Sequence, residues 1–432
     1  MRNVIIIGAD FAPSSLPPAT RIRYFAKHLP DFGWQPTILT TRPEYYESAV
    51  DAENEQLLSG SLEIIRTRAL STSRMRKIGI GDIGMRSLWH HWRALGKLRR
   101  EKKIDLIFIP VPPHMSMALG RLAQMRFGIP YVVDYIDPWI TEYYWGLPRH
   151  ERPPKWAMSY WLSRWLEPFS LRRVNHITGV SRATTDQVVS RYAHLSPQQA
   201  TEIPYGAEAG DFDYLRNHPR PNKIFDARDG RLHVSYVGAY TEPMKETLVA
   251  LFAAFRSGLD RAPEMFDRVV LHFVGTTYST NGADPFRVTR VAKECGVDQW
   301  VREHPQRIPY LDSLQTILDS DALVLLGSGE PHYTASKVFP YVLAQRPLLA
   351  VFHEESSVVK ILRETNAGRL VTFNAQTRPA ECVEEISKDL EELLADGYRW
   401  ETSWEAFDQY STRAMTGRLA LAFDQVLNSS GG

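Results

Sequence analysis

Short, mostly apolar runs alternate with longer amphipathic segments along most of the chain. The first two runs, residues 4–7 and 36–40, lie on either side of a segment with helical periodicity at residues 20–29. A short apolar run is typical of a strand that is buried on both faces of a parallel sheet. The pattern therefore predicts repeated β-α-β units, as in a doubly wound α/β fold.

One stretch, residues 207–231, lacks this alternation and contains prolines, a glycine and many charges, as is typical of a connection between domains. The alternation resumes after it. We therefore predict an α/β protein with two doubly wound, Rossmann-like domains that face each other across a cleft. The first spans residues 1–206 and the second residues 232–395. Closing helices within residues 396–432 are expected to pack back on the first domain.

The clearest indication of a ligand follows the apolar run at residues 322–326. A glycine-bearing loop comes next, and a helix is predicted to begin near Thr334 or Ser336, with Lys337 in its first turn. A helix that begins at the carboxyl end of a parallel strand directs free N–H groups and a partial positive charge toward that edge of the sheet. The arrangement predicts a phosphate site, although an ordinary β-α-β unit with a solvent-exposed lysine has the same pattern.

His114 and Asp137 follow predicted strands at residues 104–110 and 131–134. Doubly wound sheets bind ligands outside the carboxyl ends of their strands, so both titratable side chains are candidates for catalytic residues. A single histidine is more often structural, and geometry decides between the two interpretations.

The predicted helix at residues 85–103 has an apolar side, which is expected to face the core, and a basic side. The apolar side consists of Leu88, Trp89, Trp92, Leu95 and Leu98. The basic side is either a solvated face or a strip that meets anionic lipid headgroups or an acidic acceptor. It consists of Arg86, His90, Arg93, Lys97 and Arg100.

A second helical segment, residues 155–173, interleaves aromatic and basic residues. The simplest interpretation of its apolar stripe is buried core, and the alternative is an interfacial element with tryptophan at the depth of lipid headgroups. The stripe consists of Met158, Trp161, Leu162, Trp165 and Phe169, and the basic residues are Lys155, Arg164, Arg172 and Arg173. With the basic helix before it, this segment predicts peripheral attachment to an anionic membrane surface on its inner face.

The composition indicates in which compartment the protein works and which kinds of partner it binds. The 432-residue chain is 44% apolar and 23% charged, with a formal net charge of +1, which gives no reason to expect nucleic acid binding. Its two cysteines, Cys295 and Cys382, lie far apart and outside any metal-binding spacing, as expected of a cytoplasmic protein without disulfides. The sequence has no apolar run near the roughly 20 residues of a membrane span, and the first apolar run is too short for a signal peptide.

Short motifs stand in a fixed order along nearly the whole chain. They are residues 13–23, Val-Pro-Pro-His at 111–114, Asp-Tyr-Ile-Asp-Pro-Trp at 134–139, Val-Ser at 180–181, Ile-Pro-Tyr-Gly at 203–206, 236–245, and 336–347. Together they resemble the motifs of retaining glycosyltransferases with the GT-B fold, in the large bacterial family that uses nucleotide sugars (glycosyltransferase family 4-like). Tyr205 stands where that family usually has asparagine.

The resemblance implies transfer of a sugar from a UDP- or GDP-linked donor to a hydroxyl, with retention and without a metal, in cell-envelope or polysaccharide biosynthesis. The nucleotide sugar would be a co-substrate rather than a bound cofactor, and the acceptor would be lipid-linked or a glycan. His114 would contact the reacting sugar, and Asp137 would orient the sugar or the acceptor. Arg21 or Arg23 would hold an acceptor phosphate. The donor would be bound by Gly238, Lys245, Glu330, Ser336 and Lys337.

The chain departs from the family pattern at two positions. Pro340 and His332 stand where the family usually has carboxylates, and proline offers no acceptor to the ribose hydroxyls. Glu330 would have to serve from a shifted position. Two alternatives stay open: a sugar-nucleotide epimerase on the same scaffold, and a non-catalytic binding protein. Asp319 and Asp321 resemble the metal-binding DxD motif of another glycosyltransferase fold, but they precede a buried strand, and we interpret them as a helix end.

Overall fold

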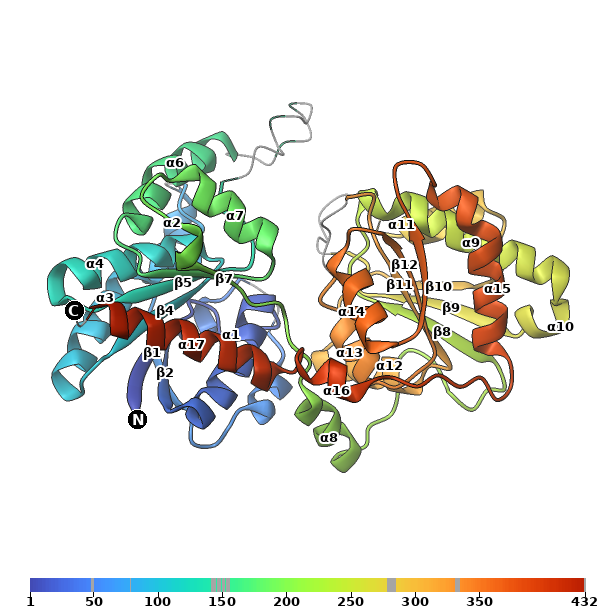
Figure 1. Cartoon of the computed structure of the whole chain (residues 1–432), viewed down its shortest axis with the longest axis horizontal. Helices are drawn as coiled ribbons and strands as arrows, with labels where there is room; N and C mark the ends of the chain where they lie inside the picture. Colours follow the sequence, from blue (N-terminus) through green and yellow to red (C-terminus); the bar gives the residue numbers. More distant parts are fainter. Residues whose placement is uncertain are drawn as a thin grey trace. The chain divides into compact units, whose positions relative to one another are not determined.

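The computed structural model describes residues 1–47, 50–77, 79–140, 145, 149, 152, 156–277, 285–330 and 335–430. The chain divides into two compact units, of which the first consists of Met1–Gly206 and Thr412–Gly432 and the second of Ala207–Ser411. In its described residues, each unit is built on a parallel sheet with helices on both faces (Figure 1). The predicted α/β class with two Rossmann-like domains is therefore confirmed.

In the described part of the first unit, seven parallel strands lie in the order β3-β2-β1-β4-β5-β6-β7. They are β1 (Arg2–Ile7), β2 (Trp34–Thr41), β3 (Glu63–Thr67), β4 (Leu106–Val111), β5 (Tyr131–Tyr135), β6 (His176–Gly179) and β7 (Ala200–Glu202). The helices are α1 (Pro17–His28), α2 (Thr72–Lys77), α3 (Ile83–Glu101), α4 (Met117–Phe127), α6 (Trp156–Leu171), α7 (Arg182–Arg191) and α17 (Thr412–Ser430). Because the strands are parallel, their carboxyl ends share one edge of the sheet, where such folds bind ligands.

Successive residues of β1 face opposite sides of this sheet, and each side has its own apolar core. Val4 and Ile6 belong to the core that α1 and α17 cover. Ile5 and Ile7 belong to the core under α3, α4 and α7. All four side chains are fully buried, which explains why the run is apolar at every position.

The described residues of the second unit form a six-stranded parallel sheet in the order β10-β9-β8-β11-β12-β13. The strands are β8 (Leu232–Val237), β9 (Val269–Val274), β10 (Val301–His304), β11 (Ala322–Leu326), β12 (Leu348–His353) and β13 (Arg369–Phe373). The helices are α8 (Ala209–Asn217), α9 (Lys245–Arg261), α10 (Pro263–Phe266), α11 (Arg287–Glu294), α12 (Tyr310–Asp319), α13 (Val338–Leu343), α14 (Ser357–Thr365), α15 (Val383–Leu394) and α16 (Trp404–Asp408). α9 and α15 pack together over one apolar core.

The expected linker, residues 207–231, is instead part of the second unit. It contains α8, whose Asp211 accepts a hydrogen bond from the hydroxyl of Tyr310 on α12 (2.8 Å). The chain passes between the units at residues 206–207 and again at 411–412. Of the closing segment, α16 belongs to the second unit, whereas α17 returns to the first and packs on α1.

Two helices of the first unit depart from the expected burial, α3 at one residue and α6 along most of its stripe. In α3, Leu95 and Leu98 face the core as expected, but Trp89 is 60% exposed. In α6, Trp161 and Trp165 of the expected core stripe are exposed. The core interpretation is therefore wrong for these residues, because a helical period fixes which residues share a side but not which side faces the sheet.

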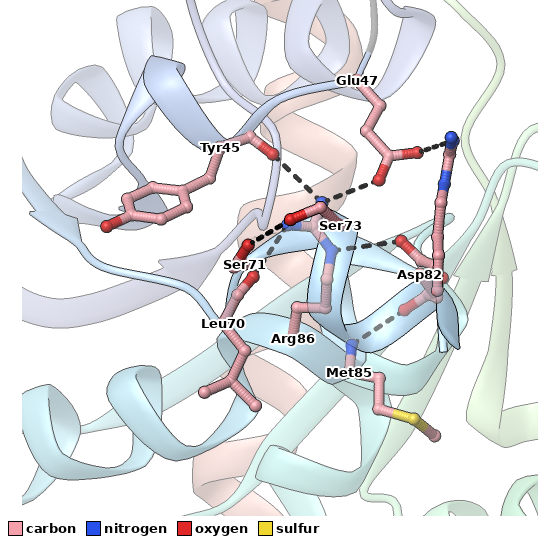
Figure 2. A network of polar contacts seen from close by, with 10 residues as sticks. Tyr45, Glu47, Leu70, Ser71, Ser73, Asp82, Met85 and Arg86 are labelled. Carbon is pink, nitrogen blue, oxygen red and sulfur yellow. Dashed lines mark hydrogen bonds and ion pairs between the residues drawn. The ribbon is translucent and has the colours of Figure 1, made fainter. Parts of the chain in front are cut away.

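Arg86, expected on the basic side of α3, is fully buried. Its guanidinium donates hydrogen bonds to the carbonyl oxygens of Gly81 (3.2 Å), Leu70 (3.1 Å) and Tyr45 (3.0 Å), and a carboxylate oxygen of Glu47 lies 3.3 Å away (Figure 2). The arginine joins three loops to the first turn of the helix. The predicted basic strip is therefore interrupted at its first member.

Candidate functional site

In the second unit, Lys337 lies beside the carboxyl end of β8. Gly238, directly after β8, has a positive φ of 145°. A Cβ atom at this position would lie 2.3 Å from Cε of Lys337. Glycine is therefore needed both for the backbone conformation and for the close approach of the lysine. The structure thus brings together two residues that the sequence assigned to a donor site.

The ammonium group of Lys337 is held by neutral groups. Its Nζ donates to the hydroxyl of Tyr236 and to the carbonyl oxygen of Ala239 (3.3 Å), and it lies 4.2 Å from the centre of the Tyr236 ring. Burial, and to a smaller extent the charge of Arg307, lowers the pKa of Lys337 to about 7. The residue as a whole is half-buried, and an anion bound beside its ammonium group would favour the charged form.

α13 is shorter than the helix predicted from the sequence. It has six residues, its N-cap is Lys337, and no side chain caps it. Ser336 is exposed in the preceding turn, and Thr334 lies outside the described residues. The hydroxyl of Tyr341 anchors the helix by accepting a hydrogen bond from the backbone N–H of Val237 (2.6 Å). So short a helix has a small dipole, and Lys337 itself is the main source of positive charge here.

Lys245 and Glu330 are exposed on neighbouring segments of the same unit. Lys245 begins α9, and Glu330 lies in the loop after β11. The Thr247 hydroxyl donates to the carbonyl oxygen of Gly327 (2.8 Å), which holds the start of α9 against that loop. Both charged residues therefore lie near the carboxyl ends of β8 and β11.

Arg307 is a residue that the sequence analysis did not identify. It follows β10, and its charge is the second cause, after burial, of the lowered pKa of Lys337. A backbone hydrogen bond from Gly275 to His304 (2.8 Å) holds the end of β9 against the end of β10. A basic residue soon after a strand could have indicated this position in the sequence. The strand β10 has only four residues, however, and its apolar pattern is too short to recognise.

In the first unit, His114 and Asp137 lie at the carboxyl ends of the neighbouring strands β4 and β5. Nε2 of His114 is 2.9 Å from the backbone oxygen of Asp137, and the imidazole stacks on Trp139 with 5.4 Å between ring centres. Because a carbonyl oxygen only accepts, Nε2 carries the proton and Nδ1 presents a lone pair. Burial lowers the pKa of His114 to about 4, so the ring is neutral at physiological pH. Partial desolvation raises the pKa of Asp137, although that residue is exposed.

Arg21 is buried in an ion pair rather than open to an acceptor. It is 2% exposed, and its Nε and Nη2 donate to the two carboxylate oxygens of Asp134 (2.6 and 2.9 Å). Its Nη1 and Nη2 also donate to the carbonyl oxygens of Pro204 (3.1 Å) and Ile203 (2.7 Å). The Thr178 hydroxyl donates to the same carboxylate (2.7 Å). The cluster links α1, β5 and β6 to residues 203–204, near the end of the Met1–Gly206 stretch.

Arg23 is also buried, at 5% exposure, with its guanidinium carbon 4.6 Å from the centre of the Tyr24 ring. Both arginines are thus almost fully shielded from solvent. The expectation that Arg21 or Arg23 holds an acceptor phosphate therefore has no support in this geometry.

Asp10 is a second residue that the sequence analysis did not identify. It follows β1 at the carboxyl edge of the sheet and is 8% exposed. Within the described residues, its buried Oδ1 has no hydrogen-bond partner. Burial, and then the charges of Asp82 and Glu47, raise its pKa to about 6, while Arg86 opposes the shift. In the sequence, this residue could have been recognised as an acidic side chain just after the first predicted strand.

The metal-motif resemblance at residues 319–321 has a structural explanation. Asp319 accepts a hydrogen bond from the Gln315 side chain (2.9 Å), and Asp321 accepts one from the backbone N–H of His233 (2.7 Å). In the ranges that the structure describes, no group of three or more His, Cys, Asp or Glu side chains is placed to hold a metal ion. No helix among those residues is long and apolar enough to cross a bilayer.

Comparison with known proteins finds a family model that matches part of the chain, within the first unit. A model of the glycosyl transferase 4-like domain matches residues 18–206. No curated protein matches the sequence.

Solved structures share the fold of the whole chain at low identity. Anabaena HepE in complex with UDP and glucose has a TM-score of 0.60 at 12% identity, covering 98% of this chain and 100% of its own. A UDP-forming α,α-trehalose-phosphate synthase from Burkholderia xenovorans has a TM-score of 0.63 at 12% identity, covering 98% and 99%. A glycosyltransferase from Rickettsia africae has a TM-score of 0.57 at 11% identity, covering 99% and 98%. At such identities the likeness concerns the fold.

Proposed function

We propose that the chain transfers a sugar from a nucleotide diphosphate to a hydroxyl with retention, because residues 18–206 match the model of the glycosyl transferase 4-like domain and the whole chain shares its fold with GT-B glycosyltransferases. One observation carries the donor half of this proposal. Lys337 lies at the carboxyl edge of a parallel sheet, packed against Gly238, with its ammonium group held by neutral oxygens. A diphosphate bound at this edge would give the Lys337 ammonium group an anionic partner.

The donor in this proposal is a UDP-sugar. Anabaena HepE has been solved with UDP and with UDP-glucose, which favours uridine over guanosine. When the bond from the sugar to the diphosphate breaks, negative charge grows on the leaving phosphate while the sugar passes through an oxocarbenium-like state. Lys337 and Arg307 would stabilise that charge without a metal. Gly238 leaves room for the lysine, Lys245 adds charge nearby, and Ser336 and Glu330 would contact the nucleotide.

In the first unit, His114 is proposed to contact the reacting sugar. Its neutral ring presents the Nδ1 lone pair, which suits a hydrogen bond accepted from a sugar hydroxyl. The Asp137 carboxylate would orient the sugar or the acceptor. We propose transfer without a covalent enzyme intermediate, so neither residue acts as a nucleophile.

The acceptor in this proposal is a lipid-linked or cell-envelope glycan, and the protein would work at the surface of a membrane. The support is the exposed tryptophan and arginine content of the first unit, in which Trp161, Trp165 and Arg164 are all exposed. Such side chains are typical of the bilayer interface.

Replacement of Lys337 by alanine tests the donor half. With UDP-glucose and other UDP-sugars as donors, Lys337→Ala should lower turnover by about 100-fold, as expected when one charge-stabilising group is lost. Thermal unfolding should change little, because the half-buried lysine has neutral partners. Lys360→Ala, which removes an exposed lysine of α14 in the same unit, is the matched control. Equal turnover in the two variants would exclude Lys337 from the site.

Pro340 favours one alternative, a GT-B protein that has lost catalysis. It lies in α13 where the family usually has a carboxylate, and His332, at the other such position, lies outside the described residues. Calorimetry with UDP and GDP separates the functions: a protein that binds neither is not a glycosyltransferase of this kind. Release of an epimerised nucleotide sugar without acceptor would instead indicate an epimerase.

A further inference from the structure

The outer side of α6 carries a row of large apolar side chains that are not covered. Met158, Trp161, Trp165 and Phe169 are 52%, 57%, 77% and 38% exposed. Their spacings of three, four and four residues place them within an arc of about 80° on the helix. We call these four residues the α6 row. Scattered exposed apolar residues are ordinary, but a contiguous row of this kind marks an interaction surface.

Buried polar contacts fix the outward direction of the α6 row. Glu167, on the opposite side of α6, is fully buried. Its carboxylate accepts hydrogen bonds from the hydroxyls of Tyr135 (3.0 Å) and Tyr192 (2.7 Å) and from Nη1 of Arg191 (2.7 Å). Turning α6 to bury the tryptophans would break this network and leave charges unpaired in the interior, which is strongly unfavourable.

Basic residues border the α6 row. Arg164 lies on α6, and Arg172 and Arg173 directly follow it, and all three are exposed. From Trp156 to Arg173 the sole acidic residue is the buried Glu167, so the exposed side of this segment carries positive charge alone. Because the whole chain has a net charge of only +1, this excess is local.

A second basic segment lies at the N-terminal end of the row. A Cβ atom at Gly79 would lie 3.3 Å from Cε of Met158, so the end of α2 is next to the start of the row (Figure 1). Arg74, Arg76 and Lys77 of α2 are exposed. Arg76 pairs with Glu47 (2.6 Å), which leaves the cluster with a net positive charge. Lys155, also expected near here, lies outside the described residues.

We propose that the α6 row and its basic border form the docking surface for an anionic lipid bilayer. Indole and thioether side chains would enter the headgroup region while the arginines pair with lipid phosphates. With 16 residues, α6 is about 24 Å long and would lie along the surface rather than cross it. The inference rests on the proposed function for a membrane-bound acceptor, but the docking itself needs no nucleotide.

Binding to vesicles tests the proposal directly. The full-length protein should co-sediment with vesicles that contain phosphatidylglycerol and much less with phosphatidylcholine alone, and added salt should weaken binding. The variant Trp161→Ser/Trp165→Ser should lose at least about tenfold in partitioning. Arg172→Gln/Arg173→Gln should lose mainly the dependence on anionic lipid. The matched control is Trp404→Ser, which removes an exposed tryptophan of the second unit and should bind as the wild type does.

Two further readouts distinguish this proposal from others. Brominated lipid should quench the fluorescence of the wild-type protein more than that of Trp161→Ser/Trp165→Ser. UDP binding should be equal in the wild type and in this variant. If neither protein binds UDP, that result would count against the proposed function but not against docking. Vesicle binding that is unchanged in Trp161→Ser/Trp165→Ser would overturn the proposal. So would a wild-type dimer that this variant converts to monomer, because the row would then bind a second copy.

Discussion

At the scale of single residues, Lys337 and Asp10 show one physical cause acting on opposite charges. Burial disfavours the charged form of each, so the pKa of Lys337 falls to about 7 and the pKa of Asp10 rises to about 6. Both follow the carboxyl end of a parallel strand, where ligands of such sheets bind. Each therefore titrates near physiological pH, and each gives a measurable dependence on pH.

Binding of UDP should be coupled to uptake of a proton by Lys337. Near pH 8 the free lysine, with a pKa of about 7, is mostly neutral, and a bound diphosphate favours its charged form. Affinity should therefore fall as pH rises above about 7. Calorimetry at pH 8 in two buffers with different enthalpies of ionisation measures the uptake. Lys337→Ala should remove it, and identical heats in both buffers for the wild type would contradict the assignment.

Replacement of Asp10 by asparagine should stabilise the protein near neutral pH. The folded pKa of about 6 exceeds the ordinary 3.8, so the cost of the buried charge is present above pH 6 and disappears as pH falls below about 4. The shift corresponds to about 3 kcal/mol. Denaturant unfolding should show Asp10→Asn more stable by up to that amount at pH 7.5, with little difference at pH 4.

Asp186→Asn is the control for this experiment, because Asp186 is exposed in the same unit and pairs with Arg182 in the preceding turn of α7. Its effect should be small at both pH values. A loss of stability in Asp10→Asn at neutral pH would mean that the carboxylate has a stabilising partner.

At the scale of elements, the period of apolar residues predicted the strands well but not the orientation of every helix. The interior strand β1 is apolar from Val4 to Ile7 because both its faces are covered, and that signal is local. The orientation of α3 and α6 depends instead on two buried polar residues, Arg86 and Glu167. Their partners lie far away in the sequence and have no local signature. A polar residue on the expected outer side was therefore read as solvated.

Arg86→Met should destabilise the first unit much more than the same change at Arg93. The loss of the buried Arg86 guanidinium removes the donor to carbonyl oxygens on three loops, at a cost of about 3 kcal/mol. Arg93 is exposed on the same helix, and its replacement should cost under about 0.5 kcal/mol. Urea unfolding of both variants measures the difference. Similar losses would mean that the loops satisfy those oxygens in another way.

The candidate site was predictable to the extent that its residues stand in motifs. Lys337 and Gly238 were found because each follows an apolar run with a recognisable loop. Arg307 was missed because its strand is short, and Asp10 because a single acidic residue after a strand is common. The assignment of Arg21 to an acceptor site did not foresee its buried ion pair with Asp134, which was itself assigned to a site motif. The contact between them depends on the packing of α1 against β5.

At the scale of the whole molecule, the first unit is not one continuous stretch of the sequence. The first unit is closed by α17, which comes from the far end of the chain. Gly206 and Thr412, where the chain leaves and re-enters this unit, are in close contact: a Cβ atom at Gly206 would lie 2.8 Å from Cα of Thr412. The sequence predicted that closing helices return to the first unit, but the apolar periodicity did not indicate the residue at which the chain passes from the second unit back to the first.

The dependence of the first unit on α17 can be tested at Phe423. This side chain is fully buried and packs edge-on against Trp34 and Phe108, with ring centres 5.1 and 5.3 Å away. Phe423→Ala should therefore lower the stability of the first unit by about 3–4 kcal/mol. Leu421→Ala is the matched control, since Leu421 is 65% exposed on the same helix. Hydrogen exchange measured by mass spectrometry should show faster exchange throughout β1, β2 and β4 in Phe423→Ala, with the second unit unchanged. Equal acceleration in both units would mean that they unfold together and that α17 stabilises more than the sheet it covers.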